Sequence, residues 1–492
     1  ITIIFMSCII LMLCKKTKLP RSFKITILAL LTIFGSGGTS YTWGAEPVEP
    51  SLPPAATATS QTPLAPGSTL APLDTQERQT GYVTREELDA ELNKLAIRKG
   101  DFTFVPYGYV FASAVYDTCA TVPGEFALYS QSKAINGKPL SVVDARSSRL
   151  GVRVQGPEID TLPGYEVNAV FEADFEGLVS VSRNKGGFQL RKANVELNNK
   201  ERGVRWMFGQ DWEVISPLYP QMLAYLPAGF AGNIGYRRCQ FRRDQKIEVG
   251  PNCKFLVELA LADDIIGDFT SISDAGGRSS GLPIFEGRFA VSLGEEARCG
   301  LPITVGFSGH YGEQLYNFSG LPGTYVPVGE KDITVPTWSL NLDVDIPVTE
   351  RFRIQGEYYV GENLSGFCGA INQGVDLFRR AGIKDRGGWI CFHTSVTDKL
   401  CNNTGFALDK PDKDTLVGTS LPSGGFTNAR TKNELIFTNF MYSWSKALMT
   451  GVELSYILTD YRKADVTGSE PVYSYMAPGE TFRTEIAVKY SF

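Results

Sequence analysis

Basic residues recur at alternate positions in one short segment of the chain, Gly235–Arg243. Successive side chains of an extended strand point to opposite faces, so Arg238, Gln240 and Arg242 share one face. Arg237, Phe241 and Arg243 lie on the other face and are expected to point outward. A guanidinium carries a planar set of N–H donors that can hold a carboxylate or a phosphate through two parallel hydrogen bonds. The spacing therefore predicts a surface that attracts anions.

Three further arginines are expected on the same side of the sheet, because they too alternate with apolar residues. The candidate anion-attracting, substrate-binding set is Arg149, Arg153, Arg205, Arg238, Gln240 and Arg242. An arginine that faced lipid at the middle of a bilayer would cost roughly 2–4 kcal/mol. The set is therefore expected to line a water-filled interior.

These arginines have an alternative role. Glu172, Asp174 and Glu176 lie on one face of another predicted strand and could pair with them across the interior, which would only keep the wall hydrated. Such carboxylates cannot pack in a dry core without partners. Anion attraction and internal charge pairing both remain open at this point.

The chain shows little that predicts catalysis. Ser308 and His310 lie on one face of a predicted strand, but a chain with two histidines and many serines makes such a pair by chance. No H-E-x-x-H, phosphate-binding loop or C-x-x-C spacing is present. The sequence predicts no enzyme, no metal site and no cofactor.

Cysteines could form disulfide bonds if the chain is exported to an oxidising compartment. Cys239 with Cys253, and Cys368 with Cys391 or Cys401, are the pairs that could connect loops. The connectivity stays open, because spacing alone does not fix it.

From about Phe104 to the end of the chain, apolar and polar residues alternate with period two. Leu340, Leu342 and Val344 alternate with Asn341 and Asp343, for example. A strand that is apolar on one face and charged on the other suits a barrel with lipid outside and water inside. The sequence therefore predicts an all-β, antiparallel transmembrane barrel.

Connections between the predicted strands are of two kinds. Pro347–Arg351 is a tight turn, whereas Ser365–Asp385 and Asn402–Lys432 are long polar stretches. Short turns at one end and long loops at the other are typical of outer-membrane barrels. At roughly 22–26 residues for a strand with half of its loops, this region holds about 16 strands, with 14 and 18 also open.

The N-terminal region is organised differently. A basic segment, Lys15–Lys24, precedes the apolar Ile25–Phe34 and several small residues, the layout of a secretory signal. A Pro-, Ala- and Thr-rich stretch follows, and Thr84 with Glu87 then forms a capping box for a short helix. The expected divisions are a signal peptide at 1–45, a periplasmic spacer at 46–82, a helix at 83–100 and a barrel at 101–492.

The last predicted strand is the clearest sign of destination. Ile486, Val488, Tyr490 and Phe492 form its apolar face. A final strand that ends on Phe492 is similar to the signal read by the barrel-assembly machinery, which makes that machinery an expected partner. The bacterial outer membrane and its lipid are therefore the expected surroundings. The net charge of -5 excludes a globally basic nucleic-acid binder.

Several segments together resemble the DcaP-like porins: Tyr107–Ala114, Ser148–Arg153 and, most specifically, Gly209–Trp212 followed by a Pro-containing stretch and a basic strand. The resemblance runs from about Val83 to Phe492. It implies a homotrimer of 16-stranded barrels, each with its own diffusion channel, that passes small organic anions such as dicarboxylates. The phosphate-selective porins are the nearest competing family. A non-conducting structural barrel that acts in envelope or surface assembly is the alternative function.

Overall fold

The structure is a computed structural model, and it describes residues 96–492 except 178–185, 251, 266–277, 279, 295–301, 319–331, 420–424 and 469. The expected signal peptide, spacer and most of the expected helix lie outside the described residues. The end of that helix was predicted wrongly. Ile97–Lys99 form β1, because their backbone pairs with Phe102–Phe104 at the start of β2 (Phe102–Asp117).

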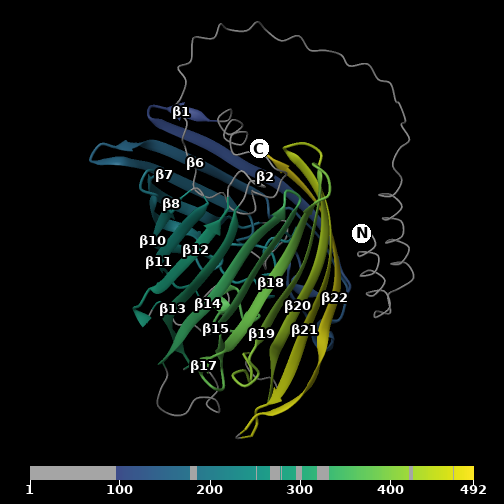
Figure 1. The fold of residues 1–492 in the computed structure, drawn as a ribbon. Helices are drawn as coiled ribbons and strands as arrows, with labels where there is room; N and C mark the ends of the chain where they lie inside the picture. Colours follow the sequence, from purple (N-terminus) through teal and green to yellow (C-terminus); the bar gives the residue numbers. More distant parts are fainter. Residues whose placement is uncertain are drawn as a thin grey trace, which may run out of the picture. The chain divides into compact units, whose positions relative to one another are not determined.

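Sixteen antiparallel strands form a closed barrel, as predicted. Besides β2 they are β6 (Arg149–Ile159), β7 (Leu162–Asp174), β8 (Gln189–Asn199), β9 (Val204–Trp212), β10 (Arg237–Glu248), β11 (Cys253–Ala262), β12 (Ile284–Leu293), β13 (Ile303–Asn317), β14 (Asp332–Thr349), β15 (Phe352–Glu362), β18 (Lys384–Ser395), β19 (Leu400–Pro411), β20 (Phe426–Ser443), β21 (Leu448–Asp465) and β22 (Val472–Ser491). Neighbours along the chain pair with one another around the ring (Figure 1).

The first and last strands close the ring, because β2 pairs with β22 from Tyr109–Ser491 to Asp117–Arg483. The closure ends on a reciprocal pair of backbone hydrogen bonds. Gly108 donates its N–H to the Phe492 carbonyl at 3.1 Å, and Phe492 donates its N–H to the Gly108 carbonyl at 3.0 Å. The C-terminal residue is therefore part of the seam.

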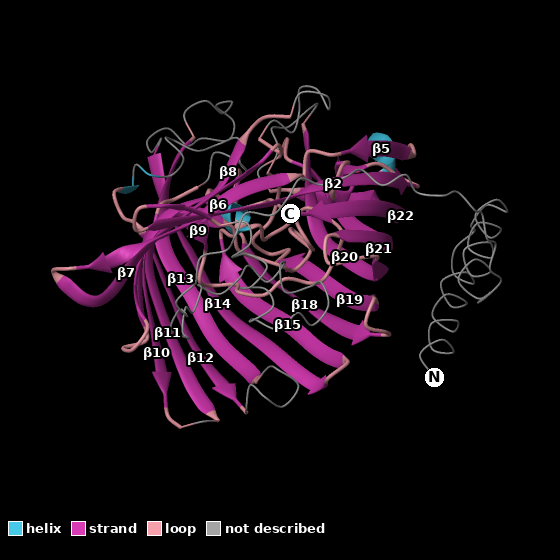
Figure 2. Cartoon of the chain, turned by 90° about the horizontal axis from the view of Figure 1, so that it is seen from above, coloured by secondary structure: helices cyan, strands magenta, loops and turns pink. Residues whose placement is uncertain are grey.

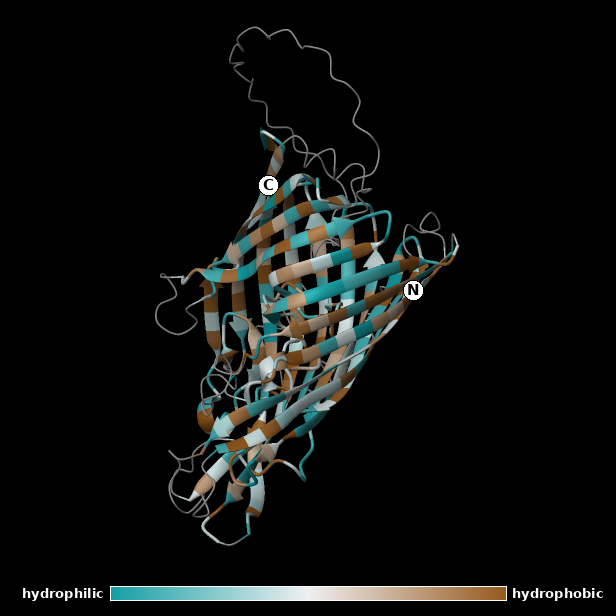
Figure 3. Cartoon of the chain, turned by 90° about the vertical axis from the view of Figure 1, so that its left-hand side faces the viewer, coloured by the Kyte–Doolittle hydropathy of each residue, from teal (hydrophilic) through white to brown (hydrophobic). Residues whose placement is uncertain are grey.

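Side chains alternate across the wall as the period predicted. Leu340 is 63% exposed on the outer face of β14, whereas Asp343 is 3% exposed on the inner face. The same contrast separates Phe171 from Glu172 on β7. Strands seen from outside carry alternating brown and teal bands (Figure 3). An apolar outer face favours lipid contact, and a charged inner face favours water.

Connections differ at the two ends of the barrel, as predicted. The turns at 160–161, 350–351 and 444–447 are short, whereas the loops at 118–148, 213–236 and 363–383 are long. The long polar stretch expected at Asn402–Lys432 was wrong, because most of it is strand in β19 and β20. β19 carries Asn402 and Thr404 on the same face as Phe406, so its apolar and polar residues do not alternate regularly.

Small elements decorate the barrel. β5 (Leu140–Asp144) pairs with the C-terminal part of β2, beyond the part that pairs with β6. β3 (Thr121–Pro123) and β4 (Ala127–Ser130) form a hairpin in the first long loop. The loop elements are α4 (Lys133–Asn136), η3 (Ser365–Phe367), β16 (Val375–Asp376) and β17 (Ala381–Gly382). Among the described residues, no helix has the length and apolar character needed to cross a membrane.

The proposed disulfide pairs were wrong, because the cysteines of the described residues are free. Cys239 and Cys253 lie at opposite ends of the β10–β11 hairpin, far beyond the roughly 7 Å that a disulfide spans. Cys368, which lies in the loop between β15 and β18, is free, and so are its two proposed partners, Cys391 and Cys401.

Candidate functional site: the loop-filled, charged interior

The long loop between β9 and β10, residues 213–236, folds into the barrel instead of extending away from it. We call it the inner loop. Ile215, Phe230 and Ile234 in this loop are fully buried or nearly so. Viewed along the barrel, loops drawn in pink lie within the ring of strands (Figure 2). The inner loop therefore narrows the interior that the wall encloses.

The Gly209–Trp212 element starts this loop. Gly209 has a φ of 127°, and an added Cβ would lie 2.2 Å from the Ala193 carbonyl oxygen, so no larger residue fits. The ring of Trp212 packs on Tyr219 of the inner loop, with 4.8 Å between ring centroids. The segment that carried the family resemblance thus positions the loop.

Three carboxylates on the barrel wall hold the backbone of the inner loop. Glu286 on β12 accepts from Val214 N–H at 3.2 Å. Glu357 on β15 accepts from Leu218 N–H at 2.9 Å. Glu453 on β21 accepts from Leu223 N–H at 2.8 Å. These bonds come from three separated strands, so the loop crosses the interior from one side to the other.

A second long loop, residues 363–383, packs against the inner loop. Phe230 N–H donates to the Cys368 carbonyl at 2.9 Å, and Gly235 N–H donates to the Phe367 carbonyl at 2.7 Å. The Phe367 ring lies 3.9 Å from the Arg238 guanidinium and 3.8 Å from the stacked ring of His310. Both groups lie against the same ring at van der Waals distance, so they occupy its two faces.

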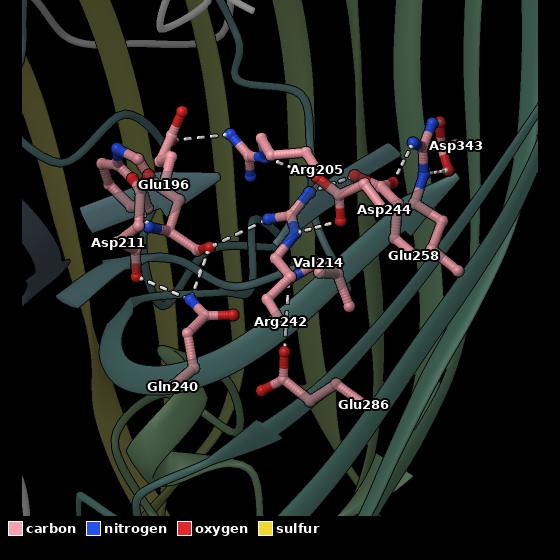
Figure 4. A network of polar contacts seen from close by, with 12 residues as sticks. Glu196, Arg205, Asp211, Val214, Gln240, Arg242, Asp244, Glu258, Glu286 and Asp343 are labelled. Carbon is pink, nitrogen blue, oxygen red and sulfur yellow. Dashed lines mark hydrogen bonds and ion pairs between the residues drawn. The ribbon is translucent and has the colours of Figure 1, made fainter. Parts of the chain in front are cut away.

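Opposite charges alternate along the inner wall (Figure 4). Arg205 bridges Glu196 at 3.0 Å and Asp244 at 2.8 Å, and Arg242 contacts Asp244 at 2.6 Å. Arg242 also contacts Glu258. The charge ladder, as we name it, continues from there through Arg288 to Asp343, each contact being 2.7 Å, and comprises Glu196, Arg205, Asp244, Arg242, Glu258, Arg288 and Asp343.

The remaining predicted site residues also face inward and have partners. Arg149 lies 3.4 Å from Glu172, and the Arg153 guanidinium lies 4.4 Å from the centre of the Tyr107 ring. Gln240 donates to the Trp212 carbonyl at 2.9 Å. Arg238 is fully buried, contacts Glu213 and lies 3.6 Å from Asp264.

The structure therefore separates two parts of the sequence prediction. The inward placement of Arg238, Gln240 and Arg242 is confirmed, with Phe241 exposed on the other face. Internal charge pairing is present. Arg149 pairs with Glu172, one of the expected carboxylates, whereas Arg205, Arg238 and Arg242 pair with other carboxylates. Arg191, which the sequence reasoning missed, holds both Glu172 and Asp174 at 2.8 Å. The attraction of anions by the predicted arginines stays a prediction.

Arg237 was expected to point outward, and this was wrong. It is 2% exposed, with its guanidinium 4.8 Å from the ring centres of both Trp212 and Tyr236. As the first residue of β10 it lies where the wall gives way to the inner loop. Among the buried arginines that the structure describes, Arg237 is the one with no carboxylate within 4 Å. Arg237 lies at the junction of loop and strand, so the alternation of side chains along β10 does not determine which way it points.

Two carboxyl groups in the loops have raised pKa values. Burial raises the pKa of Asp264 to about 6, although Arg238 opposes the shift. Burial also raises the pKa of Glu176 to about 7, although hydrogen bonding from Ser147 and the charge of Arg146 oppose it. The charge of the interior therefore changes between about pH 5 and pH 8.

Ser308 and His310 have structural partners. His310 contacts the Ser339 hydroxyl at 2.8 Å through Nδ1 and the Thr337 hydroxyl at 3.0 Å through Nε2. Ser308 donates to the Ile215 carbonyl at 2.6 Å and so helps to hold the inner loop. Within the described residues, no group of His, Cys, Asp and Glu side chains is arranged to hold a metal ion.

At the level of sequence, no family model and no curated protein matches the chain. The structure is similar to that of the outer membrane channel DcaP of Acinetobacter baumannii, with a TM-score of 0.55 and 19% identity over 80% of this chain and 99% of that one. The chain has the fold of this channel. The predicted resemblance to the DcaP-like porins is thus confirmed in fold, and a closed barrel of this kind is consistent with the predicted location in a bacterial outer membrane.

Two other solved structures are similar at lower scores. The anion-selective porin from Comamonas acidovorans aligns over 80% of this chain and 100% of that one, with a TM-score of 0.47 and 13% identity. OprB of Pseudomonas putida aligns over 83% of this chain and 97% of that one, with a TM-score of 0.48 and 10% identity. The DcaP channel is the comparison that bears on the fold.

Proposed function

We propose that this protein is an outer-membrane porin, a water-filled diffusion channel for small hydrophilic solutes. The observation that carries the proposal is the wall itself, a closed ring of sixteen strands with charged side chains inside and apolar side chains outside. Barrels of 16–18 strands are wide enough to leave an aqueous channel. The inner loop then sets how wide the passage is.

The channel prefers small organic anions, such as the dicarboxylates that the resemblance implies. The charge ladder contains three arginines and four carboxylates that lie in contact, so it offers no free cation. Arg237 supports the preference, because no carboxylate of the described residues offsets its charge beside the inner loop. An uncompensated charge raises the local concentration of counter-ions in a narrow pore.

The protein assembles as a homotrimer, as the resemblance to DcaP-like porins implies, and the barrel-assembly machinery recognises the strand that ends on Phe492. That strand closes the barrel through Gly108, so recognition and closure use the same segment. The protein has no catalytic activity, and His310 serves to position Phe367 of the second long loop.

Conductance through a planar bilayer tests the proposal. Insertion of purified protein should give uniform steps, in groups of three for a trimer, and a salt gradient should give a reversal potential on the anion side. A folded, inserted protein without conductance would contradict the porin function.

A non-conducting structural barrel is the second candidate. It is favoured by the amount of apolar side chain that the loops place inside the barrel, including Phe230 and Phe367, which are fully buried. The two candidates differ in the same bilayer experiment. Absence of conductance in protein that migrates as a folded barrel would move the assignment to this one.

A further inference from the structure

Two cations face each other on the outer surface of the barrel, away from the interior. Arg386 on β18 and Lys410 on β19 are directly opposite in the register of these strands, and both are exposed. The two strands lie side by side in Figure 1. Directly opposite side chains have Cβ atoms roughly 5 Å apart, and like charges in such positions destabilise the pair. The arrangement therefore favours a bound anion.

Nothing in the described part of the chain supplies that anion. Neither Arg386 nor Lys410 has a carboxylate within 4 Å among the described residues, and Val360 lies opposite Arg386 on β15. Lys432 lies on the neighbouring strand β20, next to Asn433, which pairs with Asp409 of β19, and its charge is compensated. It contacts Glu434 and Asp460, each at 3.1 Å. The uncompensated charge is therefore confined to the Arg386–Lys410 pair.

The pair lies at one edge of the apolar band. Four residues beyond Arg386 along β18, Ile390 is exposed and faces the exposed Phe406 of β19. Exposed apolar residues continue to Val396, next to the short turn. Ten residues separate Arg386 from Val396, which is about 33 Å of strand, or about 23–27 Å across a membrane at the tilt of such barrels. The apolar band of outer-membrane barrels is about 25 Å tall.

We propose that Arg386 and Lys410 bind the phosphate of a lipid head group in the leaflet at the long-loop end of the barrel. The site rests on the proposed placement in an outer membrane. A guanidinium holds a phosphate through two N–H donors, and the ammonium adds a second positive charge from the neighbouring strand. The acyl chains of the same lipid cover Ile390 and Phe406 below. A lipid satisfies both the cations and the apolar surface, which free phosphate does not.

The test uses the full-length protein, delipidated in detergent, and bisphosphorylated lipid A as the probe. Affinity is measured by native mass spectrometry for the wild type and for the Arg386→Gln, Lys410→Gln double variant. Binding should weaken about 30-fold in the double variant, since each cation near an anionic lipid contributes about 1 kcal/mol. Lys432→Gln is the matched control and should change affinity by less than about threefold, because its charge is already compensated.

Other results would overturn the site. Equal binding of dephosphorylated lipid A would show that phosphate is not recognised. Competition by millimolar inorganic phosphate at full strength would indicate an ion site without a lipid. Loss of the oligomer in the double variant with lipid binding intact would indicate a contact between subunits.

Conductance in neutral phosphatidylcholine bilayers separates the two proposals. The double variant should conduct like the wild type, since its changes lie outside the pore. If lipid binding fails while conductance persists, only the lipid site is wrong. If the wild type itself does not conduct, the porin function is wrong whatever the lipid does.

Discussion

Glu357 on β15 accepts a hydrogen bond from the Ser216 hydroxyl at 2.6 Å and another from Leu218 N–H at 2.9 Å. The indole of Trp389 donates to the same carboxylate at 3.1 Å. One side chain of the wall thus holds two adjacent points of the inner loop, although 141 positions separate Glu357 from Ser216. The position of the loop, and so the width of the passage, depends on this contact.

Replacing Glu357 should loosen the inner loop. Glu357→Ala removes two hydrogen bonds that hold the inner loop, each contributing about 0.5–1.5 kcal/mol, so opening of the loop becomes roughly 5- to 150-fold more frequent. Single-channel recordings should show larger and noisier steps. Glu362→Gln on the same strand is the control, because Glu362 accepts from Trp338 rather than from the inner loop. Wild-type steps in Glu357→Ala would argue against an anchoring role.

Arg237→Gln should weaken anion preference. A positive unit charge roughly 8 Å away in water stabilises a permeating anion by about 0.5 kcal/mol and destabilises a permeating cation by the same amount. Removing the charge should therefore lower the permeability ratio of anions to cations about fivefold. Reversal potentials in a salt gradient measure this ratio. Arg243→Gln, on the same strand beside the Trp206 ring, should leave the ratio unchanged. Equal effects of the two substitutions would show that the selectivity does not depend on the location of Arg237 beside the inner loop.

Arg238→Gln should act mainly on stability. It leaves the buried Glu213 without its cation and removes the bond to the Gly366 carbonyl, so unfolding should become about 3–5 kcal/mol easier. Urea titration in lipid vesicles would measure the change. Arg278→Gln breaks an exposed pair with Asp263 and should cost less than about 1 kcal/mol. A selectivity change without destabilisation in Arg238→Gln would instead favour the anion-attracting role.

Selectivity should depend on pH. The raised pKa values of Asp264, about 6, and Glu176, about 7, mean that both groups are charged at pH 8 and neutral at pH 5. Acidification therefore removes two negative charges, and the preference for anions should increase. Asp264→Asn should remove the part of the change centred near pH 6, and Glu176→Gln the part near pH 7. A ratio that stays constant from pH 8 to pH 5 would rule out this origin.

Gly108→Val should impair barrel closure. An added Cβ would lie 2.5 Å from the Arg149 carbonyl oxygen and 2.9 Å from the Phe492 ring, so the seam between β2 and β22 could not form unchanged. The folded fraction, seen as heat-dependent mobility on SDS gels, should fall. Gly137→Ala, where the nearest atoms are at 3.4 Å, is the tolerated control. Normal folding of Gly108→Val would show that the seam can adjust.

Sequence reasoning could predict the wall but only part of the site. Period-two alternation depends on neighbouring residues, so Leu340 outside and Asp343 inside could be read directly from the chain. The alternation of β19 was concealed, because Asn402 and Thr404 share the outward face with Phe406. Arg237 was misplaced because alternation ends where a strand enters a loop.

By itself, the sequence determined the class of the protein: its alternation required sixteen or so strands with lipid on one side and water on the other, and its last strand supplied the residue that closes the ring. Only the tertiary structure decided which charge meets which. Leu223 and Glu453 are 230 positions apart, and no local pattern links them. Their contact, like that of Phe367 between Arg238 and His310, exists because closure of the barrel brings distant strands and two long loops into one confined space.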